Sequence, residues 1–249
     1  MSFKDVPPSH PRYRSLLMRH LITEGGKKSI VAESGLIAHG RGEAFDYLLG
    51  EETKPFALKA IEAAAALILE SERPVFSVNG NAAALCPDEI AEIERISPIG
   101  IEINLFYRTP KREKAILKHL KKHGVKTVLG VKKSDTLRLS SLDHARRIVD
   151  RNGIAAADTV MIPLEDGDRA EALVREGKKT VVIDLNPLSR TAVSGTITIV
   201  DNITRALPLL IRKLQETAAL SGEERKKILD EYDNTAILKE AEKAVRGIL

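Results

Sequence analysis

The chain of 249 residues contains very little cysteine and few aromatic side chains. The single cysteine, Cys86, can form neither an intrachain disulfide nor a zinc site built on several thiolates, so we expect a reducing compartment. Tryptophan is absent and aromatic residues make up 4%, which argues against a protein that stacks single-stranded nucleic acid. No apolar run approaches the ~18 residues that cross a bilayer, and the polar, proline-rich start lacks a signal-peptide core. These absences predict a cytoplasmic protein with no membrane partner.

An excess of one charge sign is also missing. The 39 Lys and Arg residues against 35 Asp and Glu residues leave a net charge of +4, and the charges are mixed along the chain. Nucleic-acid binders concentrate basic residues in one stretch or on one face, so we expect no nucleic-acid partner. A mildly basic protein of this kind suits anionic small molecules.

The first third of the chain has helical character. Residues 10–23 place apolar side chains at helical spacing, and we expect this amphipathic helix to end at Gly25-Gly26. The glycines at positions 35, 40 and 42 predict a loop. Residues 54–72, which contain four consecutive alanines, predict a further helix.

From Pro74 onward, short runs rich in Val and Ile alternate with helical patterns, which is typical of βαβ units. The expected strands cover residues 74–78, 99–103, 127–131, 157–162, 180–184 and 196–200. The expected helices cover residues 88–96, 111–123, 142–152, 169–176, 203–217 and 223–245. We predict a single α/β domain over residues 1–249, with an open, doubly wound and mostly parallel sheet that has helices on both faces. Its parts are a helical N-terminal part (1–72), a sheet core (73–202) and C-terminal helices (203–249).

Polar side chains follow five of the expected strands. They occur at residues 79–81, 104–108, 163–169, 184–191 and 201–202. Ligands of open parallel sheets bind beyond the carboxyl ends of the strands, where such side chains would bind phosphate, ribose, amides or a metal ion. The sequence therefore predicts an α/β enzyme that binds a nucleotide or a phosphate.

Each of these stretches also has a structural interpretation. Residues 79–81 (Asn-Gly-Asn) suit an ordinary turn. Residues 165–168 (Glu-Asp-Gly-Asp) suit either an acidic helix N-terminus or a site for Mg²⁺, ribose or an amine. Asp184 either contacts ribose or a metal or caps the next turn, and residues 189–191 (Ser-Arg-Thr) suit a phosphate chain.

Two glycines flank Arg41, so the backbone there can approach a ligand closely. The motif is neither a dinucleotide fingerprint nor a P-loop, because the third glycine and the Gly-Lys-Ser/Thr sequence are missing. His39 and Glu43 are four residues apart and could share a helical face, as a metal pair or as a hydrogen-bonded structural pair. Cys86 follows an apolar stretch and is expected to be buried rather than nucleophilic.

Seven longer motifs cover much of the chain. They read PSHPRY at 8–13, GLIAHGRGEAFDYL at 35–48, SVNGN at 77–81, EINLFYR at 102–108, PLEDGDR at 163–169, DLNPLSR at 184–190 and TIVDN at 198–202. Together they resemble the archaeal phosphopantothenate synthetases, also called 4-phosphopantoate–β-alanine ligases. The resemblance spans about residues 7–210, and the last ~40 residues carry no recognised motif.

This resemblance implies an enzyme of coenzyme A biosynthesis. Such a ligase joins 4-phosphopantoate to β-alanine through an acyl-adenylate, using ATP and Mg²⁺ and releasing AMP and pyrophosphate, and it is a Rossmann-like homodimer. The nucleotide contacts that the resemblance implies are Arg19, Arg41, Asp184, Leu185, Asn186, Arg190, Thr191, Asn202 and Ile203. The alternative is a nucleotide-binding sensor or regulatory protein without turnover.

The reaction brings two anions together, so its site must supply positive charge. We expect Arg19, Arg41 and Arg190 to supply it with Mg²⁺, while Asp184 and Asn186 would hold ribose or metal. The metal ligands themselves stay open.

The remaining roles concern the acid and the amine. Arg108 or His39 would suit the phosphate or carboxylate of the acid. The β-alanine amine must lose a proton to attack, so a nearby carboxylate or imidazole is needed. The candidate acceptors, which together with Arg41 are the expected catalytic residues, are His39, Glu43, Glu165 and Asp166.

Overall fold

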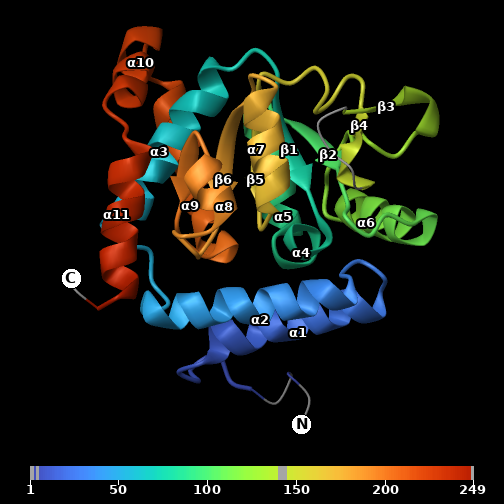
Figure 1. Ribbon diagram of the computed structural model, residues 1–249. Coiled ribbons are helices and arrows are strands. Elements are labelled where there is room, and N and C mark those ends of the chain that lie inside the picture. The colour runs from blue at the N-terminus through green and yellow to red at the C-terminus, as the bar shows by residue number, and fades with distance from the viewer. Residues whose placement is uncertain (1–2, 4–5, 140–144, 248–249) are drawn as a thin grey trace.

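The computed structural model describes residues 3, 6–139 and 145–247. Its centre is a five-stranded sheet with the strand order β2-β1-β5-β6-β7, in which every pair is parallel (Figure 1). The strands are β1 (Pro74–Val78), β2 (Gly100–Ile103), β5 (Thr159–Pro163), β6 (Lys179–Ile183) and β7 (Ile197–Ile199). The predicted α/β class and these five strands are confirmed.

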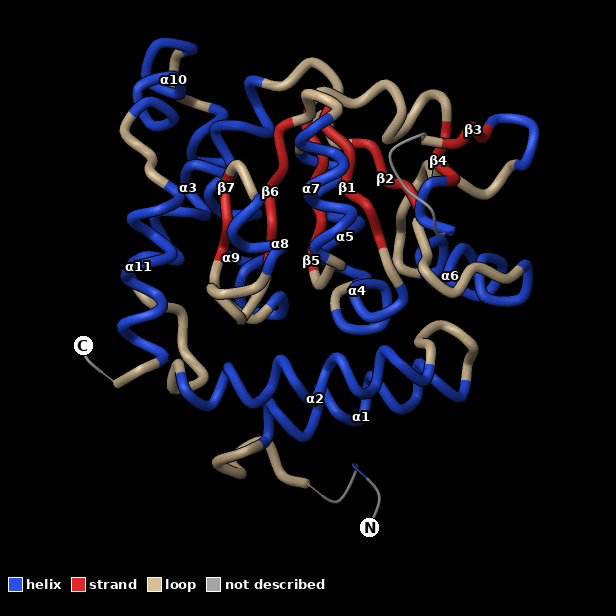
Figure 2. The backbone as a smooth tube through the Cα atoms, viewed as in Figure 1, coloured by secondary structure: helices blue, strands red, loops and turns tan. Residues whose placement is uncertain are grey.

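Helices cover both faces of this sheet (Figure 2). The strand side chains alternate between two apolar clusters, one on each face. One cluster joins the strands to α7 (Gly167–Arg175) through Val75, Val160, Ile162 and Val182. The larger cluster includes Phe76, Met161, Val181 and Ile183. The helices that contribute to it include α3 (Pro55–Glu70), α5 (Pro87–Ile96), α6 (Pro110–Lys122) and α9 (Ile203–Ala218). Burial on both faces explains why these strands read as continuous apolar runs.

The C-terminal part forms two helices, α10 (Gly222–Asp230) and α11 (Asn234–Val245), so the prediction of one helix over 223–245 is wrong. The break has a local cause. The Asp233 carboxylate accepts hydrogen bonds from the amides of Thr235 and Ala236 at 2.8 and 3.1 Å, which starts a new helix there. Both helices pack along α3, and α11 also contacts β7.

Two N-terminal helices, α1 (Tyr13–Lys27) and α2 (Glu33–Leu48), lie side by side across one end of the sheet (Figure 1). The predicted loop around Gly35, Gly40 and Gly42 is therefore wrong, and α1 does not end at Gly25-Gly26. Close packing outweighs the weak helix propensity of glycine here. A Cβ on Gly35 would lie 2.5 Å from Asn81 Oδ1, and one on Gly25 would lie 2.7 Å from Val31 Cγ2.

The free edge of β2 also differs from expectation. Residues 127–131 form no regular strand and contribute only an isolated bridge between Leu129 and Glu102. Of the predicted helix 142–152, residues 142–144 lie outside the described residues. The rest forms a 3₁₀ turn (Ala145–Arg147) and β4 (Ile148–Asp150), which pairs antiparallel with β3 (Thr136–Arg138). The buried Glu102 of β2 accepts the Asp150 amide at 3.0 Å, and Asn104, directly after β2, donates to the carbonyls of Arg146 and Ile148. These bonds use backbone groups that a helix would pair within itself.

Three further short elements complete the fold: a 3₁₀ turn (Lys133–Asp135), α4 (Gly80–Leu85) and α8 (Arg190–Ser194). Across the described ranges, every helix is too short or too polar to span a membrane. Cys86 is buried, as predicted, and burial raises the pKa of its thiol well above the usual value.

The neighbouring glycines of α1 provide a matched test of this packing. Gly25→Ala should lower the free energy of unfolding by about 1–3 kcal/mol, because the new methyl group overlaps Val31 and Ala84. Gly26→Ala meets nothing within 4 Å and should raise it by about 0.5–1 kcal/mol, since alanine is the better helix former. Urea unfolding of both variants measures the difference, and equal effects would contradict this account of α1.

Candidate active site

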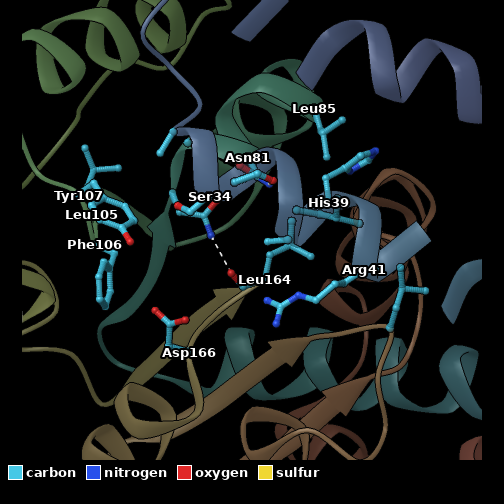
Figure 3. A pocket seen from close by; sticks show the side chains of 18 of the residues that line it. Ser34, His39, Arg41, Asn81, Leu85, Leu105, Phe106, Tyr107, Leu164 and Asp166 are labelled. Carbon is cyan, nitrogen blue, oxygen red and sulfur yellow. Dashed lines mark hydrogen bonds between the residues drawn. The ribbon is translucent and has the colours of Figure 1, made fainter. Parts of the chain in front are cut away.

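A pocket of about 260 Å³ lies between α2 and the carboxyl ends of the strands (Figure 3). Residues that follow each of the five strands line it, as the polar strand ends predict. Its wall includes residues 105–107 after β2, residues 79–81 after β1, Leu164 and Asp166 after β5, Leu185 after β6 and Asn202 after β7. The strand order therefore places the residues after β2 at one end of the pocket and those after β6 and β7 at the other.

Buried ion pairs hold α2 against this pocket. The Arg205 guanidinium donates to Asp46 Oδ1 at 2.5 Å and, through Nε, to Asp201 Oδ1 at 2.9 Å. Asn202 Nδ2 donates to Asp46 Oδ2 at 2.8 Å, and Thr53 donates to Asp201. These contacts join the C-terminal turn of α2 to the start of α9, so the roof of the pocket is tied to the end of β7.

Asn79 joins the ends of the two central strands. Its Oδ1 accepts the Ala82 amide at 3.0 Å and caps α4, while its Nδ2 donates to the carbonyls of Pro163 and Leu164 at 2.8 and 3.2 Å. The Leu164 bond is drawn in Figure 3. Leu164 has a φ of +52°, a left-handed conformation that is costly for a leucine. Asn79 is therefore a helix cap that also braces a strained strand end.

The acidic stretch after β5 separates into two environments. Glu165 has a side chain only 2% exposed, which accepts a bond from Arg169 and pairs with Arg146. Arg169 is fully buried and also donates to Ser77 Oγ at 2.9 Å. Asp166 is 49% exposed and lies in the pocket wall, with its carboxylate 3.8 Å from Arg146 Nε. Asp166, but not Glu165, thus faces the pocket.

Four of the residues implied for nucleotide binding line one end of the pocket. They are Arg41, Leu185, Asn202 and Ile203. In Figure 3 the Arg41 guanidinium points into the pocket. Gly42 of α2 faces Leu185 at this end, and a Cβ on it would lie in ordinary contact, 3.6 Å from Leu185 Cδ1.

Asp184 and Asn186 shape the turn beside this end. The Asp184 carboxylate accepts bonds from the Asn186 amide at 2.9 Å and the Ser189 hydroxyl at 2.5 Å. Burial raises the pKa of Asp184, and its bond from Ser189 acts in the opposite direction. The capping interpretation of Asp184 is thereby confirmed, and a ribose contact stays a prediction.

Like Asp184 and Asn186, three further residues implied for nucleotide binding lie outside the pocket wall. Arg19 Nε donates to both oxygens of Glu43 at 2.9 and 3.0 Å. Arg190 forms two bonds to Glu171 on the exposed side of α7, at 2.8 and 3.0 Å. The Thr191 hydroxyl donates to the Glu165 carbonyl at 2.9 Å. The structure of this single chain does not bring these three residues together at the pocket. Their nucleotide contacts stay predictions.

His39 and Glu43 share the pocket-facing side of α2, as their spacing predicts for a helix. Glu43 accepts bonds from Arg19 and from the Tyr47 hydroxyl, at 2.8 Å for the latter. The His39 Nε2 is buried and has no hydrogen-bond partner among the described residues. The expected hydrogen-bonded pair therefore does not form.

Two arginines line the pocket that sequence reasoning did not identify. Arg112, in the first turn of α6, donates to the carbonyls of Tyr107 and Ile30, while its Nε has no hydrogen-bond partner within the described part of the chain. Burial lowers its pKa. Arg146 enters the wall from the turn before β4. Arg112 lies in the first helical turn after β2, so it could have been listed among the candidate site residues. No motif or spacing around Arg146 indicates that it belongs to the site.

Arg108, which was expected to suit the acid substrate, has a structural environment instead. Its Nη1 donates to the Ile148 carbonyl at 3.0 Å, its Nη2 donates to the Gly130 carbonyl, and its Nε pairs with Glu113. It does not line the pocket. The preceding aromatic pair, Phe106 and Tyr107, does line it, with ring centroids 4.9 Å apart.

The pocket offers three arginines, Arg41, Arg112 and Arg146, against two carboxylates, Glu43 and Asp166. This balance suits an anionic ligand. No group of three or more His, Cys, Asp or Glu side chains is arranged to hold a metal ion in the ranges that the structure covers.

Comparison with known proteins agrees with these observations. The profile of the family described as phosphopantothenate/pantothenate synthetase matches residues 56–248. The 4-phosphopantoate–β-alanine ligase of Thermococcus kodakarensis is 52% identical over 231 residues, which cover 92% of this chain and 88% of that protein. The ligase of the same name from Methanosarcina mazei is 49% identical over 237 residues, covering 95% of this chain and 92% of that protein.

Burial lowers the pKa of His39 from its ordinary value of 6.5. A lowered pKa means that the ring stays neutral at pH 7 and takes up its proton only at a lower pH than an exposed histidine. An NMR titration of the six histidine rings should show this signal titrating below 6.5, with His39→Gln assigning it. A signal for His39 that titrates at or above 6.5 would contradict the environment described here.

Proposed function

This chain belongs to the phosphopantothenate/pantothenate synthetase family, and we propose that it joins 4-phosphopantoate to β-alanine with ATP in the pocket under α2. The product would be 4′-phosphopantothenate, a precursor of coenzyme A, with AMP and pyrophosphate released. The observation that carries this proposal is the gathering of Arg41, Arg112 and Arg146 at the carboxyl ends of the strands. Three cations in one pocket suit a reaction whose reactants all carry phosphate or carboxylate groups.

The strand order suggests where each substrate lies. The nucleotide would occupy the end formed after β6 and β7, near Arg41, Leu185 and Asn202. The phosphoacid would occupy the opposite end, with its phosphate toward Arg112 and Arg146. Its carboxylate would then point to the middle of the pocket, where it can meet the α-phosphate.

In the first step, a carboxylate oxygen of the acid attacks the α-phosphorus, and the bond to the pyrophosphate oxygen breaks. The products are an acyl-adenylate and pyrophosphate. Negative charge accumulates between two anions, so Arg41 at the middle of α2 is placed to stabilise it. Removing one such preorganised charge commonly slows a reaction about 100- to 1000-fold.

In the second step, the amine nitrogen of β-alanine attacks the acyl carbon and AMP leaves. The amine loses a proton, and the pocket-lining candidates for its acceptor are His39, Glu43 and Asp166. Burial keeps His39 neutral near pH 7, and its Nε2 has no hydrogen-bond partner among the described residues. We therefore favour His39 as the acceptor, because the oxygens of Glu43 already bind Arg19 and Tyr47.

A magnesium ion fits this pocket only as a partner of the nucleotide. Magnesium typically uses one or two protein carboxylates together with substrate phosphates and water, and Asp166 and Glu43 are the carboxylates available in the wall. When bound, the ion would neutralise charge on the phosphates that leave as pyrophosphate.

The product assay tests the proposal directly. Purified protein with Mg-ATP, 4-phosphopantoate and β-alanine should release AMP and pyrophosphate in equal amounts, and unphosphorylated pantoate should react poorly. Arg41→Ala should lower kcat/KM by about 100-fold or more, because the forming negative charge loses its nearest cation.

Arg14→Ala is a matched control, since Arg14 is an exposed arginine of α1 outside the pocket. It should leave the rate within about twofold of the parent. Protein that binds ATP but releases no AMP with both substrates would indicate a nucleotide sensor and overturn the proposed ligase. An Arg41→Ala variant as active as the parent would overturn the role of Arg41 alone.

We further propose that the chain forms a homodimer through the outer face of α2. Ile37 and Leu48 are 70% and 58% exposed, and their separation of eleven residues places them on one side of the helix. Light scattering should give twice the chain mass of 27.3 kDa, and Ile37→Asp with Leu48→Asp should reduce it to that of one chain. A parent protein that stays monomeric at assay concentrations contradicts the proposal.

A further inference from the structure

Arg146 lies in the pocket wall, although residues 146–154, the segment that carries it, belong to no strand of the main sheet. The segment binds the Glu102 and Asn104 side chains, and it carries Arg146 to a position beside Glu165 and Asp166. A short segment of this kind has little regular structure of its own, apart from the three-residue pairing of β3 with β4. Its position must therefore depend on side chains that bind its backbone.

Asn104 provides the contact nearest to Arg146. It directly follows β2, is fully buried, and donates from Nδ2 to the carbonyls of Arg146 and Ile148 at 3.3 and 3.1 Å. Its Oδ1 is buried without a hydrogen-bond partner among the described residues. Because an unpaired buried acceptor is unfavourable, the structural contribution of this amide comes from its two donor bonds.

Glu102 and Arg108 bind the same segment further along. The fully buried Glu102 carboxylate accepts the amides of Asp150 and Ile154 at 3.0 and 2.6 Å. Only glycine fits at position 153, since a Cβ there would lie 2.1 Å from Glu102 Oε2. Arg108 donates to the Ile148 carbonyl at 3.0 Å. Three side chains in and after β2 thus bind the backbone of this segment at four of its residues, namely 146, 148, 150 and 154.

We propose that Asn104 is a positioning residue, which holds Arg146 in the pocket wall so that its guanidinium can bind the phosphate of the phosphoacid substrate. This inference rests on the proposed function, because it uses the acid end of the pocket. Asn104 itself does not line the pocket. Its effect reaches the substrate only through the backbone of Arg146, and it is specific to the acid because the nucleotide end lies beyond β5.

The test is a comparison of KM values in the ligation assay. Asn104→Ala should raise KM for 4-phosphopantoate about tenfold, while KM for ATP and kcat change less than about threefold. Ser71→Ala is the matched control. It also removes a partly buried hydrogen bond, from Ser71 Oγ to the Leu67 carbonyl at 2.6 Å, but it lies at the opposite ends of the strands. Its KM values should match those of the parent.

A double-mutant cycle separates positioning from general destabilisation. Arg146→Ala should raise KM for the acid at least as much as Asn104→Ala, and the double variant should be no worse than Arg146→Ala alone. Additive effects would overturn the inference, as would an Asn104→Ala variant that loses kcat with both KM values unchanged. If Asn104→Ala does not fold, Asn104→Ser keeps one donor and should give a smaller rise in the same KM.

The outcomes also distinguish this inference from the proposed function. An active parent protein whose Arg146→Ala variant keeps the parental KM for the acid overturns the positioning role and leaves the ligase intact. A parent protein that forms no AMP overturns the ligase itself.

Discussion

The pocket depends on the buried ion cluster of Asp46, Asp201 and Arg205. Helix α2 contributes much of the pocket wall, and near its start Asn81 Nδ2 donates to the Gly35 carbonyl at 2.8 Å. The cluster ties its last turn to the start of α9 through side chains that are between 1% and 13% exposed. Breaking a buried pair by removing one partner costs roughly 3–5 kcal/mol, since the other charge is left without compensation. Helix α2 is thus held by buried charge at its last turn and by the close approach of Gly35 to Asn81 near its start.

That combination explains why sequence patterns predicted the sheet well and α2 poorly. The strands and most helices follow apolar periodicity, which is local, and their bounds agree with prediction to within a few residues. Gly35, Gly40 and Gly42 weaken helix propensity locally, and Gly35 is required only because Asn81 approaches it from another element. The same holds for residues 145–152, where helical periodicity is overridden by Glu102 and Asn104 binding the backbone. A pattern within one segment contains no information about such partners.

The candidate site was predictable to a similar degree. Polar residues after parallel strands must meet at one edge, so the sequence alone was enough to expect Asn79, Asp166, Leu185 and Asn202 together. The direction of each side chain could not be predicted in this way. Glu165 and Asp166 are neighbours in sequence, but one is buried between two arginines and the other faces the pocket. Arg146 reaches the wall through a segment whose path is set by long-range hydrogen bonds.

The strand order indicates why the acid carboxylate and the α-phosphate would meet between the ends of β1 and β5. From β1 the chain proceeds outward to β2, and from β5 it proceeds in the opposite direction through β6 to β7, so the sheet changes direction between β1 and β5. In open parallel sheets this switch point is where connections diverge and leave a crevice. Asn79 bridges the crevice by binding the carbonyls of Pro163 and Leu164. The proposed acid and nucleotide ends therefore lie on opposite sides of this junction, whose Leu164 has a left-handed backbone conformation. A carboxylate and an α-phosphate that approach from the two sides would meet above it, beneath Arg41.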